Sequence, residues 1–185
     1  INNDEIGEIE SVESNFGFKA KFNPKSRLYN KSFGGGSVFD LGCYPISFFM
    51  LLTEDPSRIS IKSKTLSYAE SGVDNDATVI LDYKNKIESK IHVSFKVNLE
   101  NTCKIYGKKG FIKINEPWLP NKKTTIEVSS NKHFYVKSIN SKFSIYGNQI
   151  KNVSDTFINP NITNTSENNN RYIKSFREKE KIKCC

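Results

Sequence analysis

The segment at residues 33–46 reads Phe33-Gly34-Gly35-Gly36-Ser37-Val38-Phe39-Asp40-Leu41-Gly42-Cys43-Tyr44-Pro45-Ile46. Its three consecutive glycines allow positive φ angles and close packing of the backbone against a flat surface. Ser37 is placed to cap the first turn of a helix, and the apolar run that follows predicts a buried helix over residues 37–52. Pro45 cannot donate a hydrogen bond to Leu41, so this helix is expected to be kinked or loosened there.

Asp40 and Tyr44 are the candidate functional residues of this segment. They are four residues apart and therefore project from the same face of a helix. A carboxylate and a phenol are costly to bury without partners, which makes this pair the first candidate for chemistry. A structural alternative stays open, in which a core helix follows a glycine-rich loop and its polar side chains are only hydrogen-bonded. The glycines do not form a phosphate loop, because neither G-x-G-x-x-G nor Gly-Lys-Ser/Thr occurs in the chain.

Alternation of apolar and polar residues predicts a sheet on both sides of this helix. A long first strand is expected over residues 6–22, and a run of antiparallel strands follows the helix. The clearest of them alternates from Ile87 to Val97, with one face on a core and the other in water or at a polar interface. Its partners are expected at residues 58–69, 75–84, 102–107 and 110–115, with one or two more within 124–137.

The helix segment also resembles a known protein family. The run Asn23-Pro24…Arg27-Leu28…Gly34-Gly35-Gly36-Ser37-Val38-Phe39-Asp40-Leu41-Gly42-Cys43-Tyr44-Pro45-Ile46 is similar to the start of the C-terminal domain of Gfo/Idh/MocA oxidoreductases. The resemblance is strongest to the branch of dimeric dihydrodiol dehydrogenase, D-xylose dehydrogenase and glucose–fructose oxidoreductase. It implies that Tyr44 is the catalytic acid/base and that Asp40 helps to hold the substrate. Arg27 either lines the substrate pocket or clamps the loop, and the sequence does not decide between the two.

The resemblance implies an α+β fold, with a large, open, mostly antiparallel β-sheet and helices on one face, like the C-terminal domain of glyceraldehyde-3-phosphate dehydrogenase. Residues 1–185 are expected to form one substrate and dimerisation domain. Its parts are a first strand within 1–22, a catalytic helix over 37–52, a sheet over 58–137 and C-terminal helices over 146–181.

The charge, the apolar runs and the cysteine and histidine spacing each argue against one class of binding partner. The net charge is +8 and the pI about 9.2, but the lysines are scattered, so we expect no nucleic acid partner. The longest apolar run is too short and interrupted to cross a bilayer, so no membrane partner is expected. The four cysteines and two histidines lack metal-ligand spacing, which predicts no metal site, and reduced thiols predict a cytoplasmic location. Cys43 and Cys103 are expected to be small buried hydrophobes, and Trp118 to serve packing; the cysteines are Cys43, Cys103, Cys184 and Cys185.

The resemblance covers only the second half of a family member. We therefore expect a separate Rossmann domain of roughly 120 residues to bind NAD or NADP, with no cofactor-binding residues in this chain. The family's lysine partner of the tyrosine also lies there, so the isolated chain is expected to be inactive. The implied function is hydride transfer to or from a sugar or diol, in a homodimer or higher homo-oligomer formed through the open sheet. The alternative is a non-catalytic dimerisation or binding module that retains the sheet.

Overall fold

The structure is a computed structural model that describes residues 5–119, 123–131, 133–141, 147, 150, 151 and 154. The chain divides into two compact units, Ile1–Asn140 and Ser141–Cys185. Every strand and helix discussed below belongs to the first unit. The C-terminal helices predicted over 146–181 lie almost wholly outside the described residues. The assignment of the whole chain to one domain therefore stays a prediction.

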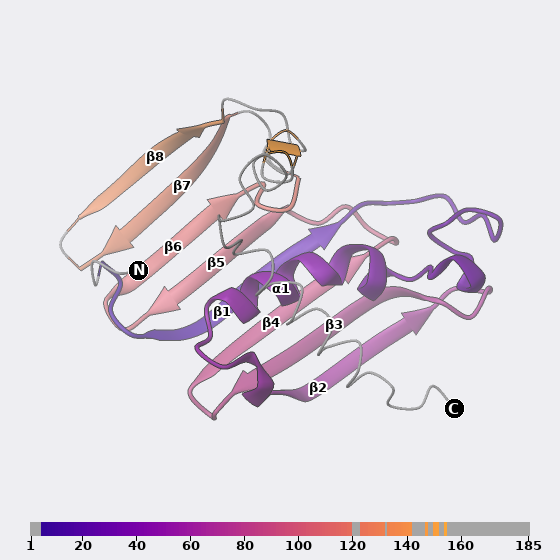
Figure 1. The fold of residues 1–185 in the computed structure, drawn as a ribbon, viewed down its shortest axis with the longest axis horizontal. Helices are drawn as coiled ribbons and strands as arrows, with labels where there is room; N and C mark the ends of the chain where they lie inside the picture. The colour runs from indigo at the N-terminus through magenta and orange to yellow at the C-terminus, as the bar shows by residue number, and fades with distance from the viewer. Residues whose placement is uncertain are drawn as a thin grey trace. The chain divides into compact units, whose positions relative to one another are not determined.

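Within the described residues, eight strands form one sheet in the order β2-β3-β4-β1-β5-β6-β7-β8. Neighbouring strands are antiparallel, apart from the parallel pair of β1 and β4 (Figure 1). The strands are β1 (Ile9–Gly17), β2 (Ile59–Tyr68), β3 (Asp74–Tyr83), β4 (Ile87–Ser94), β5 (Thr102–Gly107), β6 (Gly110–Asn115), β7 (Lys123–Ser130) and β8 (Phe134–Asn140). The predicted open, mostly antiparallel sheet is confirmed.

The first strand is shorter than predicted at both ends. Before it, Gly7 adopts a φ of +73°, which turns the chain away from the extended geometry of β1. After it, Phe18 and Ala20 donate backbone hydrogen bonds to Ser94 and Phe95 at 3.0 and 2.9 Å, in an irregular continuation of the pairing with β4. The segment over residues 6–22 therefore contains β1 and two short flanking loops.

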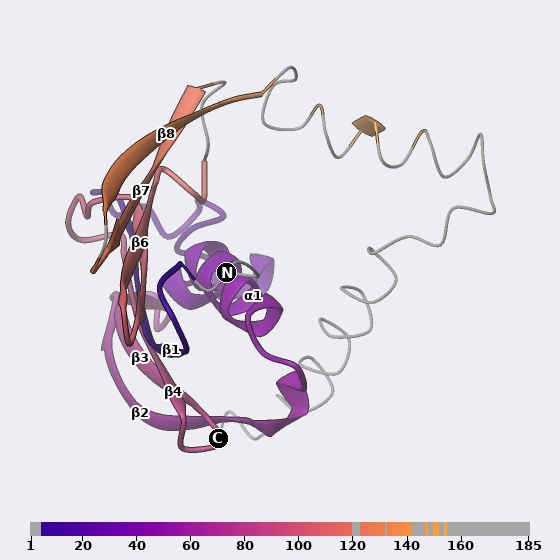
Figure 2. The same cartoon turned by 90° about the vertical axis from the view of Figure 1, so that its left-hand side faces the viewer.

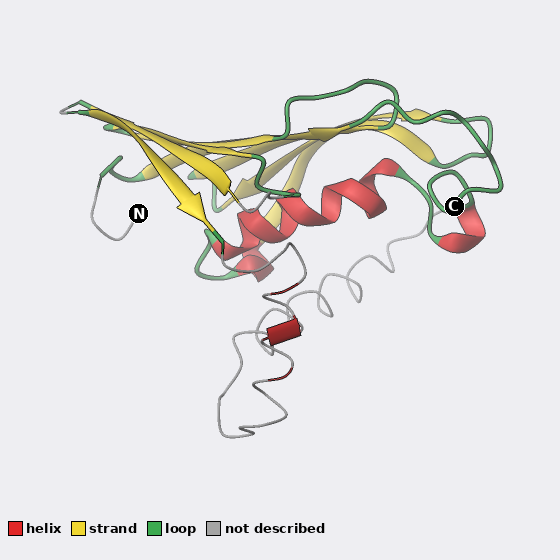
Figure 3. Cartoon of the chain, turned by 90° about the horizontal axis from the view of Figure 1, so that it is seen from above, coloured by secondary structure: helices red, strands yellow, loops and turns green. Residues whose placement is uncertain are grey.

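The predicted helix over residues 37–52 is present and lies against one face of the sheet (Figures 2 and 3). It begins as a wide π-helical turn, η2 (Val38–Gly42), and continues as α1 (Cys43–Leu51). The missing N–H of Pro45 leaves the carbonyl of Leu41 without its usual α-helical donor. This loss gives a physical reason for the wider turn just before α1.

Two details of the helix differ from expectation. The Ser37 side chain makes no capping bond to its own helix, and Cys43 is exposed rather than buried. Phe39 and Leu51 are also exposed, at 66% and 64%, so the apolar run is buried on one side only. The sequence predicted full burial because the run is apolar nearly all round.

The core lies between the helix and the sheet face that the helix covers. Phe49 of α1 and Phe95, after β4, are both fully buried at 0% exposure. Trp118 is 6% exposed, and its indole N–H donates to the carbonyl of Asn15 at 3.0 Å, which confirms its predicted packing role. The buried residues that form one apolar core cluster are Ile6, Val12, Phe16, Tyr29, Leu41, Phe49, Val73, Ala77, Leu81, Tyr83, Ile91, Val93, Phe95, Cys103, Ile105 and Trp118.

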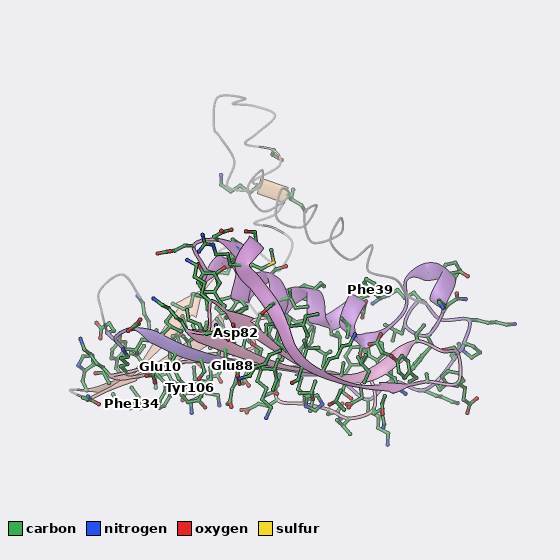
Figure 4. The ribbon with its side chains drawn as sticks, turned by 90° about the horizontal axis from the view of Figure 1, so that it is seen from below. Glu10, Phe39, Asp82, Glu88, Tyr106 and Phe134 are labelled. Atoms are coloured by element: carbon green, nitrogen blue, oxygen red, sulfur yellow. The ribbon has the colours of Figure 1, made fainter. Side chains whose placement is uncertain are left out.

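The opposite sheet face, called the open face from here on, carries charge. One row of residues in register crosses five strands and consists of Lys90, Glu13, Lys104, Lys113 and Glu127. Further along the strands, Asp82 lies directly opposite Glu88, and Lys62 of β2 forms an ion pair with Glu88. Figure 4 shows Glu88 and Tyr106 among the strands and Phe39 at the helix. Because successive side chains of a strand point to opposite faces, the apolar side chains gather on the face that the helix covers and the charged ones on the open face.

Candidate active site

Asp40 lies in the wide turn η2 and forms an ion pair with Arg27. The side chain of Asp40 is 19% exposed, whereas that of Arg27 is 71% exposed. Arg27 comes from the loop that precedes the glycines, so the ion pair joins that loop to the helix. Both predicted roles of Arg27, as a clamp of the loop and as a residue of the substrate pocket, stay predictions.

Tyr44 is the second residue of α1 and remains accessible at the surface of the helix. Its ring packs edge-to-face on Phe16 of β1, with ring centroids 5.8 Å apart and an interplanar angle of 78°. Phe16 is buried, whereas Tyr44 is 45% exposed. The sheet therefore supports one side of the phenol ring, and the residue is partly exposed.

Cys43 precedes Tyr44 in the chain and contacts Asp40. Its thiol donates a long hydrogen bond of 3.8 Å to the carbonyl of Asp40. Partial burial of the sulfur and the nearby Asp40 carboxylate together raise the pKa of Cys43 above its ordinary value. The thiol is therefore kept protonated near neutral pH and is a poor nucleophile.

The glycine loop that leads into η2 is closed by its own backbone. The amide N–H of Gly34 donates to Lys31 at 3.1 Å, that of Gly35 to Asn30 at 2.9 Å, and that of Gly36 to Leu28 at 3.0 Å; all three acceptors are carbonyl oxygens. A phosphate loop needs such amides free to face its ligand. These donors are occupied, in agreement with the sequence reading that this is not a phosphate loop.

Asp74 is a site residue that sequence reasoning did not single out. It begins β3, and its carboxylate accepts hydrogen bonds from the Ser37 hydroxyl at 2.6 Å and the Val38 amide at 2.8 Å. Thirty-seven positions separate it from Ser37. The sequence signal at Asp74 is only an acidic residue at a strand start, and no local pattern pairs it with a helix that far away.

No group of three or more potential metal ligands occurs among the described residues. Within the same residues, His92 pairs with Asp76 at 3.2 Å and His133 with Glu5 at 3.0 Å, each as an isolated pair. A transition-metal site needs a larger set of converging donors.

No helix in the described part of the chain is long and apolar enough to cross a membrane.

Comparison with known proteins gives a family-level match. Residues 1–113 match the family described as the GFO/IDH/MocA C-terminal domain. The trans-1,2-dihydrobenzene-1,2-diol dehydrogenase of Mus musculus is 30% identical over 117 residues, covering 62% of this chain and 34% of that enzyme. The Homo sapiens enzyme of the same name is 28% identical over 118 residues, with the same coverages of 62% and 34%. The chain thus spans about a third of the length of the curated relatives it matches.

Solved structures share the fold. A 3-ketoreductase from Actinomadura kijaniata, in complex with TDP-benzene and NADP, superposes with a TM-score of 0.75 at 16% identity, over 92% of this chain and 51% of that one. An aldose-aldose oxidoreductase from Caulobacter crescentus, complexed with glycerol, gives a TM-score of 0.68 at 17% identity, over 85% of this chain and 48% of that one. At these identities the likeness concerns the fold alone.

Proposed function

This chain belongs to the GFO/IDH/MocA C-terminal domain family, and from that premise we propose that it is the substrate-binding and catalytic-tyrosine half of an NAD(P)-dependent oxidoreductase. The proposed enzyme transfers a hydride to or from a CH–OH carbon of a sugar or diol. One observation carries the proposal: a helix presents the accessible Tyr44 four residues after Asp40, which is itself held by Arg27. That arrangement suits proton exchange beside an oriented substrate.

The dinucleotide is proposed to bind outside this chain. The three glycine amides of the loop are already used by backbone carbonyls, so the loop does not fit a pyrophosphate. When bound, the nicotinamide would supply the hydride acceptor or donor. We therefore propose that a separate dinucleotide-binding domain completes the enzyme, and we call the complete protein the holoenzyme. The relatives named above are about three times as long as the part that this chain matches.

Tyr44 is proposed to hold and release the proton of the substrate hydroxyl. Its exposure leaves the residue accessible, and its packing on Phe16 restricts the motion of the ring. A fixed acid/base group within hydrogen-bond reach of the reacting oxygen contributes about 10²- to 10⁴-fold to a rate. The isolated chain is expected to show no turnover, because the proposed cofactor domain is lacking.

Asp40 and Arg27 are proposed to orient the substrate, and conservative variants separate the two roles of Arg27. If the guanidinium binds substrate in a bidentate manner, Arg27→Lys and Arg27→Ala both raise KM by about tenfold, since lysine cannot form a planar fork. If Arg27 only clamps the loop, Arg27→Lys retains an ion pair with Asp40. KM should then change less than about threefold in Arg27→Lys and more in Arg27→Ala.

The proposal is tested by offering the holoenzyme NAD or NADP with a panel of dihydrodiols and aldoses. We expect at least one pair to change the nicotinamide absorbance, and Asp40→Asn to lower kcat/KM for that pair by about tenfold or more. A holoenzyme that binds the dinucleotide but turns over neither diols nor sugars would favour the alternative, a non-catalytic dimerisation or binding module. The cytoplasmic location stays a prediction.

We also propose that the open face joins subunits into a homodimer or higher homo-oligomer. The row of mixed charges, three lysines and two glutamates, suits a polar contact in which basic residues of one copy meet acidic residues of another. Lys104→Glu places a third carboxylate between Glu13 and Lys113 and is expected to weaken assembly. Sedimentation of the holoenzyme measures this, and an unchanged mass at low concentration would argue against the open face as the interface.

A further inference from the structure

One carboxylate connects the start of the helix that carries Asp40 and Tyr44 to the sheet. Asp74, at the start of β3, accepts hydrogen bonds from the Ser37 hydroxyl at 2.6 Å and from the Val38 amide at 2.8 Å. Ser37 is fully buried, at 0% exposure. A single side-chain oxygen, Oδ2 of Asp74, accepts both bonds.

This attachment replaces an ordinary cap. The first amides of a helix have no partner within the helix, and a residue just before it usually supplies one. Ser37 occupies that position but donates its hydroxyl outward to Asp74, and makes no bond to the helix amides. The negative carboxylate also lies at the positive end of the helix dipole. The start of the helix is therefore fixed by the sheet and not by its own sequence.

Gly36 provides the space for this contact. Its φ is +129°, which favours glycine, and a Cβ at this position would lie 2.4 Å from Oδ1 of Asp74. The carbonyl of Gly36 in turn accepts the amide N–H of Asp40 at 3.0 Å. Asp74 thus contacts Gly36 and Val38, and Gly36 in turn accepts the hydrogen bond from Asp40. Tyr44 follows in the same helix, as the second residue of α1.

We infer that Asp74 is a positioning residue of the active site, which holds the helix start so that Asp40 keeps its ion pair with Arg27 and Tyr44 keeps its packing on Phe16 of β1. The inference rests on the proposed function for its catalytic consequence. Its structural part, the attachment of the helix to β3, does not. Loss of the carboxylate should let the wide turn shift, and a shift of about 1 Å near reacting groups costs on the order of a hundredfold in rate.

The test compares Asp74→Ala with Asp74→Asn, Ser37→Ala and a matched control in the holoenzyme. The control is Asp76→Asn, two residues further along β3, whose carboxylate pairs with His92 on the other face of the sheet. Asp74→Ala should lower kcat by about tenfold to a hundredfold with KM within about threefold. Asp74→Asn retains an acceptor for Val38 and should restore most of the activity. Ser37→Ala should have an intermediate effect, and Asp76→Asn almost none.

Hydrogen exchange supplies a readout that does not need activity. Loss of a cap corresponds to about a threefold to thirtyfold change in a local opening equilibrium. Asp74→Ala should speed exchange of the Val38 and Asp40 amides by that factor, with the β3–β4 ladder unchanged. If Asp74→Ala fails to fold, Asp74→Asn and Ser37→Ala carry the same comparison at smaller amplitude.

The outcomes separate this inference from the proposed function. Faster local exchange in Asp74→Ala, together with full activity in Tyr44→Phe, would support the attachment and reject Tyr44 as the acid/base. Unchanged exchange and a kcat within twofold in Asp74→Ala, while Tyr44→Phe is inactive, would overturn the positioning role. Faster exchange throughout the sheet, with kcat and KM both altered, would also overturn it, because that pattern indicates a general structural role.

Discussion

The two faces of the sheet differ in chemistry: the covered face is packed and apolar, and the open face is charged. On the covered face, β1 contributes Val12 and Phe16 to a packed core, and its buried Ser14 donates to the sulfur of Cys103 at 3.5 Å. On the open face, the same strand presents Glu13 between Lys90 and Lys104. The covered face gains its stability from area removed from water, whereas exposed charge pairs contribute little. Packing should therefore dominate stability on one face, and charge should govern association on the other.

The largest expected effect on stability comes from the covered face. Phe49→Ala removes a fully buried ring and should lower the free energy of unfolding by about 3 to 5 kcal/mol. Phe39→Ala, in the same helical segment but 66% exposed, should change it by less than about 0.5 kcal/mol. Urea unfolding of the 185-residue chain measures both. Equal losses in the two variants would contradict the division of the helix into a buried and an exposed side.

The covered face also predicts a pH effect at Cys103. Burial raises the pKa of this thiol to about 11 from 9.0, because the thiolate is poorly solvated in the core. The folded state then holds its proton more tightly than the unfolded state. The resulting stability is present below pH 9 and is lost as the pH rises toward 11.

A comparison of wild type with Cys103→Ala isolates this contribution, since lysines and tyrosines titrate in both. From about pH 8 to about pH 11, wild type should lose about 2 kcal/mol more of its free energy of unfolding than the variant. The variant starts lower because of the lost packing, so the slopes are compared and not the absolute values. Parallel slopes would show that burial does not raise the pKa of the Cys103 thiol.

The smallest effect is expected on the open face. Lys113 of β6 pairs with Glu100 at 3.0 Å, and the Glu100 side chain is 68% exposed. Lys113→Met should change the free energy of unfolding by less than about 1 kcal/mol, because exposed ion pairs are well screened. The same urea measurement at low and high salt tests this. A loss as large as that of Phe49→Ala would remove the distinction between the faces.

The strands and the helix were predictable because each follows from a pattern in a short stretch of sequence. The alternation from Ile87 onward predicted β4 and its two-sided character, and the lack of an N–H at Pro45 predicted a loosened turn. The position of β1 in the middle of the sheet, parallel to β4, has no local signal, because it depends on pairing between residues 77 positions apart.

The candidate site divides in the same way. The spacing of Asp40 and Tyr44 is a local property of a helix and was visible in the sequence. The ion pair of Arg27 with Asp40 and the two bonds to Asp74 are tertiary contacts, which a single sequence does not encode in any short pattern. Exposure of Cys43 was missed for a related reason: an apolar run indicates a helix but does not indicate which of its sides meets the sheet.

The central claim is that the covered face supports a catalytic tyrosine, and turnover of Tyr44→Phe in the holoenzyme tests it most directly. The control is Tyr68→Phe, because Tyr68 lies at the end of the edge strand β2 and is 64% exposed. We predict that Tyr44→Phe lowers kcat by about two to four orders of magnitude while Tyr68→Phe leaves it unchanged. A Tyr44→Phe enzyme with kcat within about threefold of wild type would contradict the account.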